Sequence, residues 1–468
     1  MRQFLLIFFS LIQTVVHAQI SDNLIPLLNI ETVDGEMPTY TIVNAPEGCI
    51  GTSITDNNYV PGRMVMTLKG ETYYDSGDYE KNVSGMRIKV RGNSTGAFMN
   101  QHPYKIKLSK KSDLLNRGNK DYKHKEWLLL GMYTWNKKMT NQESNILHIA
   151  GLIISKIVGL SWTPSYDFVH VVLNGEYQGM YYLMEAVSKG DKRVNIEESG
   201  FLIEHDTFWW NEDVYFKTDR QISTCGYTYK YPDSDDVTED IQNDMKAYMN
   251  KVEESIYEKG DIVQHIDVES FAKWMLAHDI LGTDDVAGCN RFLSKKNNTS
   301  LLEMGPTWDY DSTFRSDGWS SIHSSIWFYY AQLFQNEDFV KTYINLWYTI
   351  RPTLMNDITT SFEEVWQKYG SVFDESMKIH QTKYPDEGQQ ILREQIDEVI
   401  GKFNERIAIL DELMHQYDAF TSIQNTIQES RITIITDLMG RKYQHQQGVP
   451  HGLYIYKYNN GKTKKIAH

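Results

Sequence analysis

Two acidic residues stand one position apart in the stretch GPTWDYDSTF, residues 305–314. Acidic residues are poor strand formers, whereas aromatic residues are good ones. The leading Gly-Pro dipeptide disfavours a helix, so we predict an extended segment. In a strand, Asp309 and Asp311 share one face, while Trp308 and Tyr310 share the other. The pattern predicts carboxylates presented on one side and aromatic rings anchored in the core or in a cleft wall on the other.

A second polar group precedes this stretch, in the segment HDILGTDDVAGCNRFLSK. We expect a helix ending near Gly282, then a loop with Asp284, Asp285 and Asn290, then a strand RFLSK. Hard cations such as Mg²⁺ prefer carboxylate and amide oxygens. Phosphoryl transfer uses an Asp near the attacking hydroxyl and metal-holding Asn and Asp residues close by. The alternative is ordinary turn chemistry, because Asp and Asn hydrogen-bond their own backbone in loops.

The elements that must position these residues begin with a β-rich part, residues 20–110. Apolar and basic residues alternate in MRIKVRG and in YKIKL, which predicts two half-buried strands with one basic face. Arg91, Lys105 and Lys107 belong to that face. The alternative is that these cations only solvate the outside of a sheet.

The middle of the chain mixes strands and helices. An apolar helix is expected over 142–158, followed by a hairpin whose Asn174-Gly175 dipeptide suits a type I′ turn. SGFLIEHD and GYTYKYPD predict further strands. From about residue 235 the pattern becomes helical, and 337–415 is expected to be mostly helix.

Composition excludes several classes of protein. The 468 residues carry a net charge of -15 with no basic stripe, so we expect no nucleic-acid partner. The three cysteines, Cys49, Cys225 and Cys289, are far apart and predict neither a zinc site nor a disulfide framework. A carbohydrate-related role would rest only on the 13% aromatic content, so it ranks last.

The N-terminus has the pattern of a secretory signal peptide. Arg2 precedes a short apolar run, and Val16-His17-Ala18 is a small-residue cleavage site. Cleavage would leave Gln19 as the first residue. The apolar run is too short for a spanning helix, and no later stretch approaches a membrane span.

Several blocks together resemble the CotH kinase-like family, named for a bacterial spore-coat protein. The resemblance covers roughly residues 80–415. The blocks stand in the family's order: MRIKVRGNST, PYKIKL, EWLLLGMYTWNKKMTNQESNILHIAGL, VVLNGEYQGMYYLMEAV, DDVAGCN, WDYDSTF and FNERIAILDELM.

The resemblance implies an α+β, atypical protein-kinase-like fold of two lobes. A β-rich N-terminal lobe and a mainly helical C-terminal lobe would bind ATP and a divalent metal, Mg²⁺ or Mn²⁺, between them. The expected division is a signal peptide at 1–18, a β segment at 19–80, the CotH kinase-like domain at 81–418 and a small β module at 425–468.

The resemblance also implies a role for each candidate residue. Asp285 would orient or deprotonate the acceptor hydroxyl, with Asp284 as its competitor. The metal would be held by Asn290, Asp309 and Asp311. The nucleotide phosphates would meet Lys105, Lys107 and Arg91, and Glu185 would lie near the connection between the lobes or pair with a surface cation.

Departures from the family pattern leave the activity open. Val286 and Ala287 stand where Arg and His are usual after the catalytic Asp, and Gln101 and His102 where lysines are usual. Thr307 replaces a frequent proline before the Trp. Asn136 and Thr140 occupy places where the family usually shows Asp and Arg. Two hypotheses follow: an exported metal-dependent kinase acting on a protein hydroxyl, or a noncatalytic envelope or surface protein that keeps the fold and binds a partner.

The tail, with GRKY, GLYIY and GKTKK, is similar to the C-terminal modules of secreted Bacteroidetes proteins. Such modules act as export or surface-attachment signals. Together with the leader, they predict a location in the periplasm, on the cell surface or outside the cell. The acceptor substrate, the preferred metal and the oligomeric state are not encoded in any motif identified above.

Overall fold

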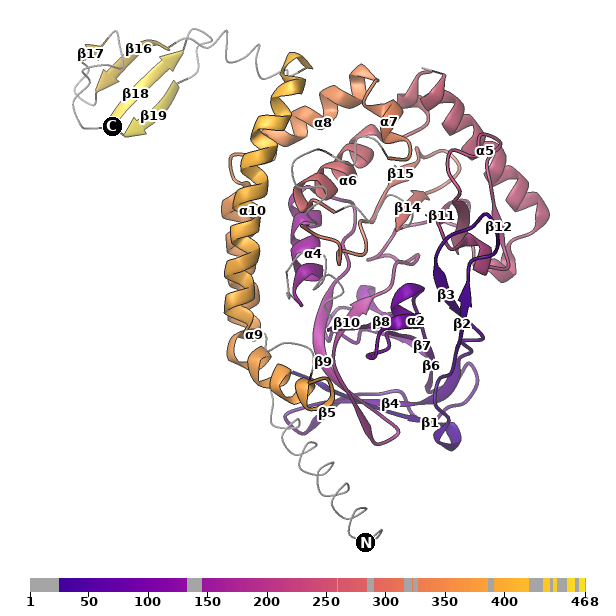
Figure 1. Ribbon diagram of the computed structural model, residues 1–468. Coiled ribbons are helices and arrows are strands. Elements are labelled where there is room, and N and C mark those ends of the chain that lie inside the picture. The colour runs from indigo at the N-terminus through magenta and orange to yellow at the C-terminus, as the bar shows by residue number, and fades with distance from the viewer. Residues whose placement is uncertain are drawn as a thin grey trace.

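The computed structural model describes most of the chain. The described residues are 25–132, 145–258, 260–283, 290–314, 322, 327–385, 391–420, 432–437, 441–443, 453–458 and 463–467. Their β-rich first half and helical second half confirm the expected α+β class (Figure 1).

Seven strands of the first half close into a barrel, in the lower part of Figure 1. The order of neighbours is β1-β9-β10-β8-β7-β6-β4, and β4 also pairs with β1, which closes the ring. A further strand, β5 (Glu71–Asp75), pairs with β4. The seven strands are β1 (Leu27–Thr32), β4 (Val60–Leu68), β6 (Met86–Val90), β7 (Tyr104–Ser112), β8 (His124–Gly131), β9 (Tyr166–Leu173) and β10 (Glu176–Glu185).

Alternate residues of each strand fill the barrel interior. In β6, Met86, Ile88 and Val90 are buried, while Arg87 and Lys89 between them are half-buried. β7 repeats this alternation and turns its first two lysines outward. Both strands are therefore half-buried with one basic face, as their sequences predict.

The tight hairpin between β9 and β10 is also confirmed. Asn174 and Gly175 both have positive φ, 51° and 80°, as a type I′ turn requires. The Asn174 side chain also accepts a hydrogen bond from the Thr32 backbone at 2.9 Å. The turn thereby ties the hairpin to β1.

Strands β8 to β10 are apolar on both faces. Their outward side chains, among them Leu130, Phe168 and Tyr182, belong to a second and larger core shared with the helices. Burial of both faces explains why these sequences are nearly continuous apolar runs.

A second sheet has the order β12-β13-β11-β14-β15. It contains the expected strands SGFLIEHD, GYTYKYPD and RFLSK. Its members are β11 (Phe201–Asp206), β12 (Tyr215–Phe216), β13 (Gly226–Tyr231), β14 (Arg291–Lys295) and β15 (Glu303–Met304). A separate hairpin, β2 (Thr41–Asn44) with β3 (Thr52–Thr55), contacts the short helix α2 (Ser94–Phe98).

Helices pack against the barrel and against the second sheet. The helix expected over 142–158 is α4, which begins only at Leu147, and residues 133–144 are outside the described part. The helices are α4 (Leu147–Ile157), α5 (Glu239–Tyr257), α6 (Val268–Leu281), α7 (Tyr330–Leu333), α8 (Glu337–Ile350), α9 (Leu354–Lys383) and α10 (Leu392–Met414). Short 3₁₀ helices are η1 (Val33–Gly35), η2 (Lys120–Tyr122), η3 (Trp209–Asn211), η4 (Ser234–Asp236), η5 (Ile262–Gln264) and η9 (His415–Phe420).

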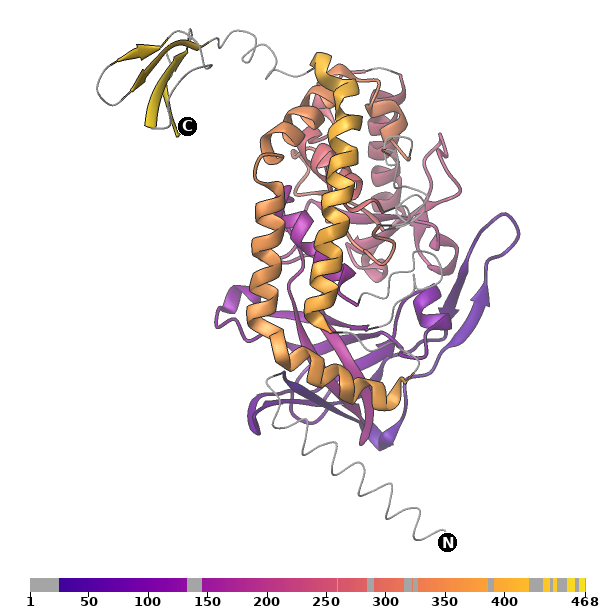
Figure 2. The ribbon, with the colours of Figure 1, turned by 60° about the vertical axis from the view of Figure 1, so that its left-hand side comes forward.

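The two long helices α9 and α10 lie side by side (Figure 2). α9 is bent at Gly370 and extends to the barrel, where the Met180 backbone donates a hydrogen bond to Nδ1 of His380 at 3.1 Å. In the described parts of the chain, no helix combines the length and the apolar character needed to cross a bilayer.

A four-stranded antiparallel sheet ends the chain and lies apart from the helices in both views (Figures 1 and 2). It confirms the expected short β runs of the tail. The strands are β16 (Ile432–Asp437), β17 (Lys442–Tyr443), β18 (Leu453–Tyr458) and β19 (Thr463–Ala467). The leader at 1–18 and the expected turn at 459–461 lie outside the described residues.

Candidate functional site

The Asp309 stretch is not the strand that its sequence predicts. β15 ends at Met304, and the backbone of Asp309 has φ 60°, a left-handed conformation that no strand contains. Asp and Asn adopt this conformation more readily than most residues because their short polar side chains can bond locally. The prediction of an extended segment was therefore wrong, although burial still alternates: Trp308 and Tyr310 are buried, and Asp309 and Asp311 are half-buried.

Tyr310 anchors this turn in the core. Its hydroxyl donates to the Thr307 carbonyl at 2.9 Å and lies 3.1 Å from the Ser155 hydroxyl on α4. The ring packs directly on Gly151 of the same helix, where an added methyl group would meet the ring at 2.1 Å. The absence of a side chain at Gly151 is therefore what admits the tyrosine.

The turn is also tied to the end of α6. The Phe314 backbone donates to the Leu281 carbonyl at 2.9 Å, one residue before the helix closes at Gly282 in a left-handed cap. The loop with Asp284 and Asp285 follows at once, so the chain leaves α6 beside the Asp309 turn. Residues 284–289 lie outside the described part, and the proposed catalytic Asp285 with them.

Buried polar contacts fix the last turn of α6. The Asp279 carboxylate accepts a hydrogen bond from Tyr343 on α8 at 2.7 Å, and its carbonyl accepts one from Arg406 on α10 at 2.9 Å. His278 is fully buried and lies 2.7 Å from the Thr283 hydroxyl. These contacts set the point from which the following loop departs.

Asn290 and Arg91 converge on Asp309. The Asn290 amide lies 3.4 Å from the Asp309 carboxylate, at the upper limit of a hydrogen bond, and its backbone has φ 61°. Arg91, which follows β6 of the barrel, is close enough for its charge to act on the same carboxylate. The structure thus brings together three of the predicted residues, from the barrel, the second sheet and the 305–314 stretch.

Two opposing effects act on the Asp309 carboxyl group. Surrounding protein raises its pKa above the ordinary value, because burial disfavours the charged form. Arg91 and the Asn290 amide lower it, and Glu204 raises it further. Burial prevails, and a cation bound at this carboxylate would favour its charged form.

The second sheet contributes acids that the sequence reasoning did not single out. Glu204 and Asp206 alternate on β11 and are both buried, and Lys230 on β13 lies 3.0 Å from Glu204. Acidic residues are depleted in strands, so the presence of two in the strand sequence FLIEHD is the signal that could have identified them as candidate site residues. Burial, followed by the charge of Glu204, raises the pKa of Asp206 to about 7.

Charged groups of the barrel and of the residues in and after β11 lie within electrostatic range of one another. The charges that act on Lys89 include Lys105 and Arg91 from the barrel and Glu212 from the far side. Glu212 also acts on Asp206 and on Lys230. Arg91 of the barrel and Glu204 of the second sheet both lie close enough for their charges to act on Asp309.

Lys105 and Lys107 both lie near the carboxylate of Glu126, on the neighbouring strand β8. The Lys105 ammonium is 2.9 Å from Glu126, and that of Lys107 is 4.0 Å from the same oxygen. Each lysine side chain is about one third exposed, at 30% and 32%. They are therefore partly enclosed and paired rather than free on a solvated sheet face.

Glu185 belongs to a separate ion-pair network. Its side chain is 1% exposed and lies 2.9 Å from Arg117, which also pairs with Asp113. The Ser165 backbone donates to its other oxygen at 2.9 Å. Glu185 is thus buried at the end of β10 and pairs with a partly exposed cation, in line with the alternative of an ion pair.

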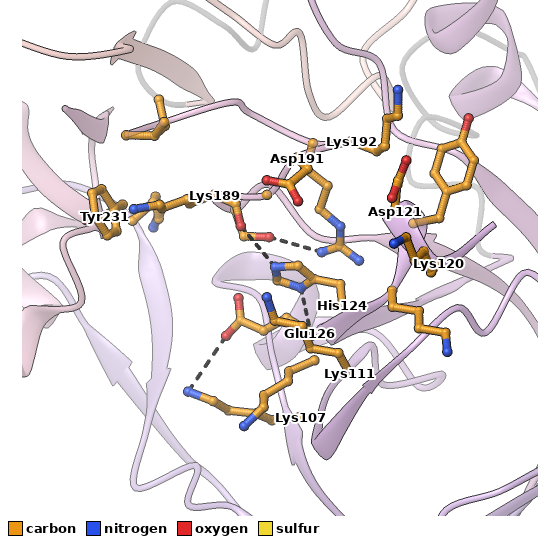
Figure 3. Close-up of a pocket in the computed structure, with 18 of the residues that line it drawn as sticks. Lys107, Lys111, Lys120, Asp121, His124, Glu126, Lys189, Asp191, Lys192 and Tyr231 are labelled. Atoms are coloured by element: carbon orange, nitrogen blue, oxygen red, sulfur yellow. Dashed lines mark hydrogen bonds and ion pairs between the residues drawn. The ribbon is translucent and has the colours of Figure 1, made fainter. Parts of the chain in front are cut away.

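A basic cavity of about 670 Å³ lies between the barrel, the segment after β10 and the end of β13 (Figure 3). Eight lysines and one arginine line it against four carboxylates. Its lining shares Lys107 and Glu126 with the basic barrel face, but none of Arg91, Asn290 and Asp309.

The donor set at Asp309 suits a hard cation. Within the described residues, no cluster of three His, Cys, Asp or Glu side chains is arranged to hold a metal ion. Mg²⁺ does not need one, because it commonly keeps several waters and takes one or two carboxylates together with substrate phosphates. Asp309 and the amide of Asn290 fit that requirement.

Comparison with known families agrees with the resemblance drawn from the motifs. The family model described as CotH kinase protein matches residues 88–410, more than half of the chain. The chain belongs to the CotH kinase family. A search of curated proteins gives no match.

Two of the departures from the family pattern have structural roles in this CotH-family chain. Gln101 is buried, accepting from the Met132 backbone and donating to the Met180 carbonyl, both at 2.7 Å. It therefore joins β8 to β10 inside the protein. Thr307 bonds the anchoring Tyr310 through its hydroxyl at 2.9 Å, which a proline could not do.

Proposed function

We propose that this protein is an exported atypical kinase that transfers the γ-phosphate of ATP to a protein hydroxyl in a metal-dependent reaction. The observation that carries the proposal is the convergence of Arg91, from the barrel, and Asn290, which precedes β14, on Asp309. Membership of the CotH kinase family supports a kinase-like activity in general.

The two-lobe arrangement is part of the proposal. The barrel would be the N-terminal lobe, and the second sheet with α5 to α10 the C-terminal lobe. Nucleotide would lie between them, near Asp309, on which the charges of Arg91 from the barrel and Glu204 from the second sheet both act. Electrostatic stabilisation of this kind is the main contribution that a protein makes to phosphoryl transfer.

Each residue then has a definite task. Asp309 and Asn290 would hold Mg²⁺ or Mn²⁺, with Asp311 in support. The ion, when bound, would neutralise charge on the phosphate oxygens. Arg91, Lys105 and Lys107 would orient those phosphates.

The transfer itself breaks the bond between the γ-phosphorus and the bridging oxygen, and forms one to the acceptor oxygen. Asp285 would take the acceptor's proton, and ADP would leave. Asp284 is the competing candidate for this step, and variants of each residue separate the two.

The noncatalytic alternative rests on Gln101, which is buried and hydrogen-bonded to the Met132 and Met180 backbones at a position where the family pattern has lysine. With glutamine at this position, one positive charge that could contact the nucleotide phosphates is missing. Its absence weakens the case for catalysis and does not affect the case for partner binding. The same experiment decides between the two functions.

The test is nucleotide binding and phosphate transfer by the chain lacking only the proposed leader. Binding of ATP with Mg²⁺ or Mn²⁺ is measured by calorimetry, and autophosphorylation by mass spectrometry. We expect wild type to bind and to transfer phosphate. Asp309→Ala should lose metal-dependent binding, whereas Asp285→Ala should bind and fail to transfer.

The outcomes discriminate between the two functions. Absence of nucleotide binding with either metal would overturn the kinase proposal in favour of the noncatalytic one. Normal binding by Asp309→Ala would refute the metal assignment alone. Asp284→Ala serves as the matched control for Asp285→Ala, because the two neighbours carry the same charge.

Export is a separate part of the proposal and has its own test. Expression in a bacterial host followed by fractionation and N-terminal sequencing should give a chain that starts at Gln19 outside the cytoplasm. A cytoplasmic product that retains residues 1–18 would contradict it.

A further inference from the structure

Apart from Lys107, the residues that line the basic cavity take no part in the proposed kinase chemistry. Its wall comes from β7, from residues 120–126, from residues 188–196 and from the end of β13. In Figure 3, Tyr231 and Lys189 lie on one side, Lys120 and Lys192 on the other, and Lys107 and Lys111 below. Positive groups therefore surround the space from several segments.

The charge of the cavity is opposite to that of the chain. The whole protein has a net charge of -15, yet cations outnumber carboxylates about two to one in this lining. Concentrating like charges around a concave space costs repulsion, which an anion inside the space would relieve. Solvated lysines scattered over a surface would not require such an arrangement.

Most of these lysines are not neutralised by the described protein. Lys107 and Lys230 have carboxylate partners, Glu126 and Glu204. Lys189 lies over the Tyr231 ring at 3.7 Å. The remaining five have no ion-pair partner among the described residues: Lys111, Lys120, Lys123, Lys125 and Lys192.

The floor of the cavity is rigid. His124 receives the Glu126 backbone hydrogen on Nδ1 at 3.1 Å, so its Nε2 donates to the Lys189 carbonyl at 3.0 Å. Arg193, nearly buried, donates to the Ala186 carbonyl and the Ser188 hydroxyl and stacks over Trp127. Exposed lysines are thus carried on a frame held by hydrogen bonds.

We propose that this cavity binds a small ligand bearing several phosphate groups, independently of the Asp309 centre. A volume of about 670 Å³ suits a small molecule rather than a folded partner. Lysines bind phosphate as point charges, and several around one space favour a polyanion over a monoanion. The ligand is either a free polyphosphate compound or the phosphate chain of a nucleotide.

The test measures binding of tripolyphosphate to the full chain by calorimetry in EDTA, so that no metal takes part. We expect binding by wild type and by Asp309→Asn. The triple variant Lys120→Gln, Lys123→Gln, Lys192→Gln should bind roughly tenfold or more weakly, because each exposed pair adds a small amount. ATP and AMP in the same buffer distinguish a nucleotide from a free polyphosphate.

A matched control separates the cavity from general electrostatics. The triple variant Lys69→Gln, Lys81→Gln, Lys251→Gln removes the same charge from three exposed lysines elsewhere and should bind like wild type. Equal losses in the two triple variants, or no binding by wild type, would overturn the proposal. Loss of binding in Asp309→Asn would also overturn it, by placing the anion at the metal centre. Because this assay contains no free metal, its result can be distinguished from the result of the metal–ATP test of the proposed kinase.

Discussion

The Asp309 turn and the basic cavity both collect charge, but they hold it in different ways. At Asp309 the acid lies in a left-handed backbone turn, anchored by Tyr310 and enclosed so that burial raises its pKa. In the cavity, five lysines have no ion-pair partner in the described structure and extend from a rigid floor. The first arrangement depends on each buried contact, whereas the second depends on the sum of many weak ones.

This difference predicts how the two regions respond to substitution. A single change near Asp309 should have a large effect, since buried groups are packed and desolvated. A single change in the cavity should have a small effect, since exposed charges are screened and interchangeable.

The largest effect is expected for Gly151→Ala, which changes no charged group. The new methyl group would lie 2.1 Å from the Tyr310 ring, so the ring and the attached Asp309 turn must move. Overpacking of this kind should lower the free energy of unfolding by about 2–3 kcal/mol. Urea unfolding followed by circular dichroism measures it.

The control for that substitution is Gly401→Ala on α10. A methyl group there meets no atom within 4 Å, so only helix propensity changes. We expect a gain of about 0.5–1 kcal/mol. If both variants had the same stability, the packing of Tyr310 on α4 would not be what holds the turn.

The next effect concerns pH and Asp206. Its pKa in the folded protein is about 7, above the unfolded value, so its contribution to stability is present at low pH and is lost as pH rises toward 7. Asp206→Asn keeps an oxygen to accept the Phe208 backbone hydrogen bond, 2.8 Å in wild type. It should therefore gain stability relative to wild type by about 2 kcal/mol between pH 4.5 and pH 7.

Urea unfolding in EDTA across that range measures the difference. Asp219→Asn is the control, because Asp219 is exposed and lies 2.8 Å from Lys246, which lowers its pKa. Its variant should show no such gain over the same range. A flat difference for Asp206→Asn would mean that Glu204 and Asp206 do not share a buried environment.

Features of the fold and of the site that depend on interactions between residues close in sequence could be predicted from the sequence. The β6 and β7 alternation, the Asn174-Gly175 turn and the end of α6 at Gly282 depend on local pattern and backbone preference, and all three were predicted. The motif order also predicted that Asp309 and Asn290 lie together.

What the sequence missed depends on tertiary contacts. The left-handed Asp309 is imposed by the Tyr310 anchor on α4, a contact that spans more than 150 residues. The roles of Glu204 and Asp206 become apparent only in the folded chain, where both are buried and the charge of Glu204 acts on Asp206 and Asp309. Barrel closure through β1 and β4, and the gathering of distant lysines around one cavity, likewise require the folded chain.

A smaller effect is expected for Arg91→Met. Arg91 lowers the pKa of Asp309, so its removal would let protons compete better with a metal. Calorimetry should give roughly tenfold weaker binding of ATP with Mg²⁺, about 1.4 kcal/mol, and a greater loss at pH 6 than at pH 8. Arg87→Met removes a cation from β6 that lies over Tyr59, and should leave binding nearly unchanged. Equal losses in both variants would show that the barrel face acts as a diffuse field and that Arg91 has no special place.

The smallest effect is expected for Lys192→Gln alone. One of several mobile lysines should contribute well under 1 kcal/mol, so tripolyphosphate affinity should fall only about two- to threefold. The loss should shrink further between 50 and 200 mM salt, because screening acts on exposed charges. Calorimetry at the two salt concentrations measures both changes. A loss of a hundredfold from this one residue would contradict the additive picture of the cavity and make it resemble the Asp309 turn, where a single contact decides.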